Sequence, residues 1–296
     1  MAYMHGMPLA ESSGLGCGAG CGCRSCGSHS ARLGEPPAAR QLTRVPHASV
    51  GPWRAVCRIE ARQDDRGVSI GSGVYITAVH VLTCAHVILP LQAPNTRAIT
   101  VHPGQNGADA DTPSFKAVRW EVSPRWRASD CMTAGEDYGL ILMPPQNGFI
   151  PTIPFLPADL LGAVVTIAGF PASQETRARH MYTAQGRVLG GILLSSCTAE
   201  TAEGRLLPNI PAATNLIAHD IQTGGSMSGS PIWFTKDTRR LAAIHTGRID
   251  NQTKGKAIIL NDTVRAQIRH WMQTTLAAPA RRPVPAPVRT PAGAAR

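Results

Sequence analysis

Short apolar or alternating runs follow one another from residue 53 onward, each about as long as a β-strand and bounded by Gly, Pro, Asn or Asp. The first batch comprises 53–59, 68–76, 81–84, 98–102, 115–120 and 138–143. A Pro-rich passage at 144–157 precedes a second batch, which comprises 161–168, 183–188, 191–196, 216–221, 231–235, 241–245 and 257–260. Two batches of about six strands favour two β-barrels or sandwiches joined by a linker.

One segment near the end of the sequence has helical periodicity. Apolar side chains recur at Val264, Ile268, Trp271 and Met272, and Asp262 is placed to cap the first turn. This pattern predicts an amphipathic helix that begins at Asp262 and ends near residue 276.

The two ends of the chain differ in composition from the strand-rich part. Residues 1–47 are rich in Gly, Ala, Ser, Pro and Cys without apolar periodicity, and residues 277–296 are rich in Pro, Ala and Arg. Such segments cannot bury enough apolar surface to become ordered. We therefore expect a disordered Cys/Gly-rich arm at 1–47 and a disordered tail at 277–296. The first barrel then occupies 48–150, and the second barrel with the helix occupies 151–276.

The net charge of +10 arises from 29 basic and 19 acidic residues, so nucleic acid has to be considered as a partner. The excess is dispersed, however, and part of it lies in the tail. No basic run is interleaved with aromatic residues, which make up only 5% of the chain. The pattern therefore favours a solvated basic surface over nucleic-acid binding.

Membrane insertion and secretion are not indicated. The longest stretches without charge, 138–157 and 160–174, are interrupted by prolines, and the amino terminus lacks a basic start followed by an apolar stretch. We expect a cytoplasmic protein without a membrane partner and with reduced thiols. Its oligomeric state is left open.

Four of the eight cysteines cluster near the amino terminus, namely Cys17, Cys21, Cys23 and Cys26. Four thiolates can hold zinc or an iron–sulfur cluster, but the spacing is not that of paired Cys-x-x-Cys motifs. An oxidisable Gly/Cys-rich arm accounts for the cluster better than a metal site does. These residues are weak metal candidates, and we expect no cofactor.

A candidate nucleophile is found in the stretch 228–231, Ser-Gly-Ser-Pro, where Ser228 lies in a Gly-rich turn just before a strand. A nucleophilic serine needs an exposed hydroxyl and nearby backbone N–H groups that can receive an oxyanion. Such a turn is also typical of an ordinary hairpin, so it does not identify a nucleophile alone.

Two further residues provide the groups that a serine nucleophile requires. His86 follows the apolar run at 81–84, and Asp137 precedes the run at 138–143. A histidine takes the serine proton, and a carboxylate holds that histidine in the correct tautomer. Taken singly, His86 is more typical of a structural histidine, and Asp137 is more typical of an acid in a turn.

The three stretches together resemble the signatures of the chymotrypsin-like serine proteases. Leu-Thr-Cys-Ala-His at 82–86 resembles their Leu-Thr-Ala-Ala-His, and Asp-Tyr-Gly-Leu-Ile-Leu at 137–142 resembles their Asp-x-Ala-Leu-Leu. Ser-Met-Ser-Gly-Ser-Pro at 226–231 resembles their Gly-x-Ser-Gly-Gly/Ser-Pro. The resemblance implies an all-β fold of two antiparallel six-stranded barrels with a C-terminal helix. It also implies a serine endopeptidase that acts on proteins or peptides, with catalytic His86, Asp137 and Ser228.

Within this family, the sequence is most similar to the glutamyl endopeptidases and their trypsin-like bacterial relatives. The stretch 70–74 resembles their entry strand and Gly-Ser-Gly-Val turn, and 243–247 resembles their Gly-Ile-His-x-Gly. The likeness implies a specificity pocket lined by Thr223 and His245. We add the nearby Thr246 and Arg248 to the substrate-binding candidates. Their donors and positive charge suit a substrate Glu or Asp. If His245 only packs, the pocket instead suits small or apolar side chains.

Two departures from the family pattern concern the nucleophile turn. Ser226 stands where the family has Gly, although the resemblance assigns the oxyanion hole to the backbone N–H groups of Ser226 and Ser228. A side chain at 226 is expected to resist the required backbone conformation. Met227 replaces the Asp of trypsin, which argues against activation by that zymogen switch. A catalytically weak or inactive protease-fold binding protein is the alternative; a metal- or nucleic-acid-dependent role of the arm and tail is a second.

Overall fold

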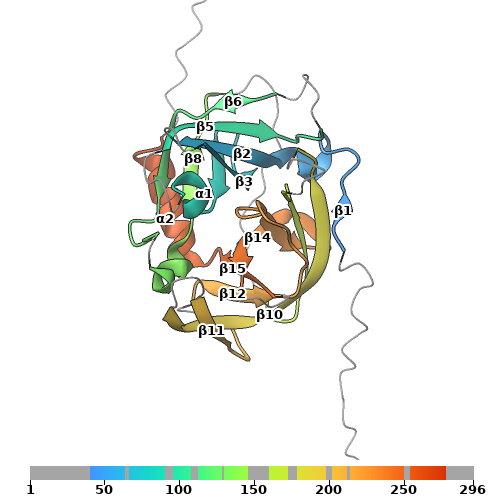
Figure 1. The fold of residues 1–296 in the computed structure, drawn as a ribbon, viewed down its shortest axis with the longest axis vertical. Coiled ribbons are helices and arrows are strands. Elements are labelled where there is room, and N and C mark those ends of the chain that lie inside the picture. Colours follow the sequence, from blue (N-terminus) through green and yellow to red (C-terminus); the bar gives the residue numbers. More distant parts are fainter. Residues whose placement is uncertain are drawn as a thin grey trace, which may run out of the picture. The chain divides into compact units, whose positions relative to one another are not determined.

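The computed structural model describes residues 41–63, 67–90, 96–107, 113–128, 130–145, 160–172, 179–197, 202–211, 214–249 and 254–277. Within these ranges the chain is almost entirely β-structure, arranged in two antiparallel sheets with one longer helix, α2 (Figure 1). The all-β prediction is therefore confirmed.

The first sheet has seven strands in the order β6-β5-β2-β3-β4-β8-β7. Its strands are β2 (Val56–Gln63), β3 (Val68–Tyr75), β4 (His80–Thr83), β5 (Thr96–Pro103), β6 (Phe115–Lys116), β7 (Arg119–Val122) and β8 (Gly139–Leu142). Alternate side chains of β2, such as Cys57 and Ile59, are fully buried in the core. Among the described residues no ladder joins β6 to β7, so this sheet is a half-barrel.

The second sheet closes into a six-stranded barrel in the order β9-β10-β12-β15-β14-β13, because β9 also pairs with β10. β1 and β11 add to β10 outside this ring. The strands are β1 (Thr43–Arg44), β9 (Val164–Gly169), β10 (Tyr182–Cys197), β11 (Ala202–Leu206), β12 (Leu216–His219), β13 (Pro231–Phe234), β14 (Asp237–Arg248) and β15 (Gly255–Ile259). Val165, Ile167, Ile217 and Ile232 belong to its buried apolar core.

Several predicted strand limits need correction. The runs 183–188 and 191–196 form the single strand β10, in which the register with β12 shifts between Val188 and Gly190. The irregularity allows one strand to bend where the sequence suggests two. Trp53 lies in a 3₁₀-helix (Gly51–Ala55) rather than in a strand. The short strands β1 and β11 have no clear pattern in the sequence.

The predicted C-terminal helix is present as α2 (Asp262–Gln273). Its cap is Asn261 and not Asp262, because the Asn261 side chain accepts a hydrogen bond from the backbone N–H of Val264 at 3.1 Å. Val264 and Trp271 are buried, and Trp271 packs on Tyr138, next to β8, with ring centroids 5.9 Å apart. The helix that follows the second sheet thus packs against the first.

The expectations for the far ends of the chain lie largely outside the described residues. Residues 1–40, including the cysteine cluster, and residues 278–296 are not among the described residues. The same holds for 146–157 of the expected linker at 144–157. Thr43 and Arg44, which the sequence assigns to the arm, pair with β10 as strand β1.

Among the described helices, none has the length and apolar character needed to cross a bilayer. Cys57 and Cys84 are buried free thiols, whereas Cys131 is disulfide-bonded. The expectation of reduced thiols is therefore wrong for Cys131.

Candidate active site

His86 and Asp137 are brought together by the pairing of β4 with β8. Thr83, the last residue of β4, lies opposite Gly139, the first residue of β8. His86 follows β4 in the short helix α1 (Ala85–Ile88), and Asp137 ends the 3₁₀-helix η2 (Cys131–Glu136) just before β8. The two side chains therefore meet at one edge of the ladder.

The carboxylate of Asp137 accepts two hydrogen bonds from His86. One comes from the backbone N–H at 2.9 Å, and the other from the ring Nδ1 at 2.6 Å. Because a carboxylate only accepts, Nδ1 carries the proton, and Nε2 of the neutral ring is left as an acceptor. No described residue hydrogen-bonds to that nitrogen.

The environment of His86 changes its affinity for protons. Burial lowers the pKa of His86, but the negative charge of Asp137 and the hydrogen bond to it outweigh burial. The pKa of His86 therefore lies above the usual value of an imidazole. The positive charge of Lys256, a residue of β15 that the sequence analysis missed, acts in the opposite direction.

Ser228 is half-buried on a loop that several backbone contacts hold in place. The N–H of Gly229 donates to the carbonyl of His245 at 2.7 Å, and the carbonyl of Ser228 accepts from the N–H of Ser72 at 2.8 Å. Gly229 has a φ of 86°, and a Cβ there would lie 2.0 Å from the Ser72 carbonyl oxygen. Only glycine fits this position.

Ser226 has a φ of 63° and is the only non-glycine residue in the described ranges with a positive φ. The backbone thus adopts a left-handed conformation despite the side chain, at a cost of about 1 kcal/mol. Within the described part of the chain, neither the N–H of Ser226 nor that of Ser228 has a hydrogen-bond partner. Both are available to an incoming acceptor.

The loop is adjacent to the segment that carries His86. A Cβ on Gly229 would come within 2.3 Å of Oγ1 of Thr83, three residues before His86. No hydrogen bond between Ser228 and His86 is present among the described residues. Met227, which replaces the family's Asp, is buried in the core of the second barrel.

The four predicted pocket residues lie on the loop before Ser228 and on β14. Arg248 donates through Nη2 to the carbonyl of Thr223 at 2.6 Å, which joins these two segments. Thr246 donates weakly to the carbonyl of Lys256 at 3.4 Å. His245 is 2% exposed and makes its main side-chain contact with another histidine, His219.

The His219–His245 contact determines the tautomers of both rings. The backbone N–H of Ile221 donates to Nδ1 of His219, so the proton of His219 is on Nε2. That nitrogen lies 3.1 Å from Nδ1 of His245, which must accept, and the proton of His245 is therefore on its Nε2. Burial lowers the pKa of His219 to about 3 and holds that of His245 well below its usual range, aided by neighbouring positive charges. Both rings are neutral.

Sequence reasoning missed His219 because a single histidine at the end of an apolar strand is typical of a structural residue. Lys256 gave no signal either, since a lysine in a strand is typical of a solvated surface. Lys256 is paired with Gly247 across the ladder between β14 and β15, which places it beside the predicted pocket residues.

Cys84, His86 and Asp137 could offer a metal three ligand atoms that lie within 4.8 Å of one another. The thiol of Cys84 instead donates to the carbonyl of His245 at 3.2 Å. Burial raises the pKa of Cys84 well above its usual value, so the thiol stays protonated. All three groups thus have hydrogen-bond partners in the structure, the thiol with the His245 carbonyl and His86 with Asp137.

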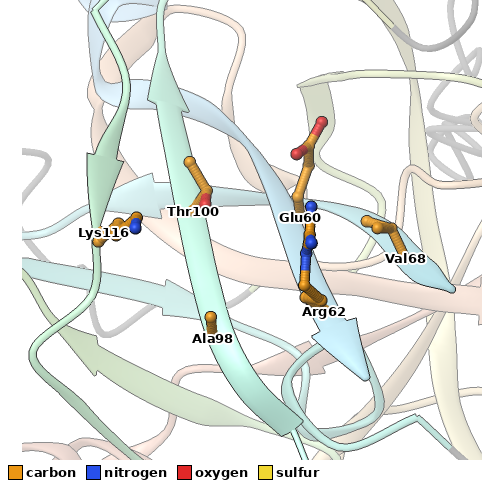
Figure 2. Close-up of a pocket in the computed structure, with 6 residues that line it drawn as sticks. All are labelled: Glu60, Arg62, Val68, Ala98, Thr100 and Lys116. Atoms are coloured by element: carbon orange, nitrogen blue, oxygen red, sulfur yellow. The ribbon is translucent and has the colours of Figure 1, made fainter. Parts of the chain in front are cut away.

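A pocket lies on the first sheet, and Figure 2 shows the residues that line it. Its lining residues come from β2, β3, β5 and β6, and are Glu60, Arg62, Val68, Ala98, Thr100 and Lys116. None of them belongs to the predicted catalytic or pocket residues.

Two antiparallel sheets, a hydrogen-bonded His–Asp pair from the first and a Gly-Ser loop from the second are the features of a trypsin-like protease. In agreement with this class, a family model described as the trypsin-like peptidase domain matches residues 71–244. The chain belongs to this family, and the match supports a serine protease-type hydrolase acting on proteins or peptides. No curated protein matches the chain.

Solved structures of proteases share the fold. A Glu endopeptidase in complex with MPD has a TM-score of 0.60 at 17% identity, covering 77% of this chain and 95% of its own. The thermostable serine protease AL20 from an extremophilic microorganism has a TM-score of 0.57 at 13% identity, covering 75% and 98%. Protease Anisep from Arthrobacter nicotinovorans has a TM-score of 0.54 at 13% identity, covering 72% and 93%. The predicted chymotrypsin-like fold is confirmed.

Proposed function

We propose that this protein is a serine endopeptidase that uses Ser228 as nucleophile, His86 as general base and acid, and Asp137 as the group that orients His86. The observation that carries the proposal is the His86–Asp137 hydrogen bond of 2.6 Å, which leaves Nε2 as an acceptor. The two N–H groups of Ser226 and Ser228 without described partners support it.

In the proposed reaction, Nε2 of His86 takes the proton of Ser228 while Oγ attacks the substrate carbonyl carbon. The N–H groups of Ser226 and Ser228 receive the negative charge that develops on the carbonyl oxygen. His86 then gives its proton to the leaving amine, and the peptide C–N bond breaks. Water, deprotonated by His86, attacks the acyl-enzyme ester, and Ser228 leaves with the returned proton.

The proposed division of labour follows the two sheets. Residues 48–150 provide His86 and Asp137, and residues 151–276 provide Ser228 and the pocket. The raised pKa of His86 suits this role, because it favours the protonated ring that exists after Ser228 has lost its proton.

The direct test is covalent labelling with a fluorophosphonate, followed by peptide mass mapping. We expect the label on Ser228 and its loss in Ser228→Ala. Ser230→Ala is the matched control, since Ser230 is a neighbouring buried serine whose hydroxyl has no partner in the described part of the chain. That variant should keep the label. A folded wild-type protein that takes no label would instead favour a protease-fold binding protein.

We also propose a preference for Glu or Asp before the scissile bond. Arg248 and Lys256 give this region positive charge, and His245 has its proton on the nitrogen that faces away from His219. A neutral imidazole N–H together with the Thr223 hydroxyl can donate to a carboxylate. A pocket for small or apolar side chains is the competing possibility, because His245 is buried against His219.

A further inference from the structure

Ser72, on β3 of the first sheet, contacts the nucleophile loop through two of its polar groups, the backbone N–H and the hydroxyl. It is fully buried. Its N–H donates to the Ser228 carbonyl at 2.8 Å, and its hydroxyl donates to the Ser226 carbonyl at 3.1 Å. Its own carbonyl accepts from Thr83 Oγ1 at 2.7 Å, which fixes Ser72 to β4.

The direction of the hydroxyl hydrogen bond is determined by a third partner. The backbone N–H of Phe170, which follows β9, donates to Ser72 Oγ at 3.0 Å. Because that N–H can only donate, the hydroxyl accepts there and uses its single hydrogen for the Ser226 carbonyl. One oxygen atom of the first sheet, Oγ of Ser72, therefore bonds both to Phe170 after β9 and to the loop that carries Ser226.

These contacts bear on the conformation of Ser226. The carbonyl of Ser226 belongs to the peptide plane after its Cα, and the N–H proposed for the oxyanion hole belongs to the plane before it. The relative orientation of the two planes depends on φ and ψ of Ser226, and its φ of 63° is unfavourable for a residue with a side chain. A contact that holds the second plane in place opposes relaxation of the first.

We propose that Ser72 is a positioning residue that keeps Ser226 in its left-handed conformation and so keeps the N–H groups of Ser226 and Ser228 directed at the substrate carbonyl. This inference rests on the proposed proteolytic function. Where the family has glycine at position 226, the backbone adopts the left-handed conformation without support. With serine at 226, the hydrogen bond from the Ser72 hydroxyl offsets the cost of that conformation.

The test combines Ser72→Ala, Ser226→Gly and the double variant in the full chain, with the rate of fluorophosphonate labelling as the readout. We expect Ser72→Ala to label about tenfold more slowly or worse, since oxyanion donors act only when well aimed. The double variant should regain most of the lost rate, because glycine needs no support. Thr166→Val is the control: it removes a buried hydroxyl that bonds Thr235 at 2.8 Å and should label at the wild-type rate.

Two outcomes overturn the inference when the wild-type protein is labelled. Either Ser72→Ala labels as fast as wild type, or the double variant is as slow as Ser72→Ala. If the wild-type protein takes no label, the proposed function fails, and urea unfolding midpoints then decide the positioning role. Ser72→Ala must lower the midpoint less in the Ser226→Gly background than in the wild-type background. Equal losses in the two backgrounds overturn it.

Discussion

His86 and His219 are imidazoles of the same chemistry whose surroundings change their pKa values in opposite directions. His86 faces the carboxylate of Asp137, which outweighs burial and raises its pKa. His219 faces the neutral ring of His245, and burial alone lowers its pKa to about 3. The partner thus decides whether a buried ring can take up a proton or remains a fixed neutral donor.

The largest effect is expected where the carboxylate is removed from His86. Asp137→Asn should lower kcat for peptide hydrolysis by about 10⁴-fold, because an amide does not fix the tautomer that leaves Nε2 free. Initial rates with a peptide mixture measure this. The matched control is Asp130→Asn, an exposed acid that accepts from the N–H of Met132 and should retain most activity. Equal losses in both variants would contradict the assignment.

The histidine pair of the second barrel should affect stability in acid. The pKa of His219 is lowered in the folded state, so the unfolded chain binds more protons between about pH 6.5 and pH 3. Folding stability should therefore fall as the pH is lowered through this window, by up to about 5 kcal/mol from this residue. Urea unfolding at several pH values measures the slope.

The variant His219→Gln tests this assignment, because it should make folding stability depend less steeply on pH between about pH 6.5 and pH 3. His270→Gln, at an exposed position on α2, should leave the slope as in the wild-type protein. If His219→Gln keeps the full slope, another group is responsible for it. His86 contributes with the opposite sign: its raised pKa adds stability at low pH that is lost as the pH rises through the folded value.

A smaller effect is expected on substrate choice. His245→Gln and Arg248→Gln should each reduce cleavage after Glu relative to cleavage after Ala by about tenfold or more, since a charged hydrogen bond is lost. Profiling of a peptide library gives this ratio. Arg240→Gln removes an exposed cation from the same strand β14 and should leave the ratio unchanged. Unaltered Glu cleavage in both pocket variants would argue for the small or apolar pocket.

The smallest effect is expected from Lys256, which acts on His86 of the first sheet and on His245 of the second. The charge of Lys256 lowers the pKa of both His86 and His245. Lys256→Met should therefore move the acidic inflection of the kcat/KM profile, where His86 loses its proton, to higher pH. Lys254→Met, which removes the cation just before β15, serves as the control. An inflection that does not move, or that moves to lower pH, would contradict this influence.

Much of the fold and the catalytic candidates could be predicted because the signals are local. His86 and Asp137 flank apolar runs that form paired strands, and the Gly-Ser turn precedes another. Contacts between distant segments left no such signal: the 72–228 hydrogen bond joins residues 156 positions apart, and the His219–His245 contact joins two strands. The cap was also misassigned, since Asn261 and Asp262 are adjacent and both are good capping residues.

Each end of the described chain packs against the sheet that is farther from it along the sequence. β1 precedes the first sheet along the chain but pairs with β10 in the second, and α2 follows the second sheet but packs beside β8 of the first. His80 of β4 also contacts the carbonyl of Leu276 at 2.8 Å. In a chain that is still being synthesised, the first sheet therefore cannot make its contacts with α2 and Leu276 until residue 276 has emerged from the ribosome. Neither half is expected to fold as a separate fragment, and the many long-range contacts predict slow folding.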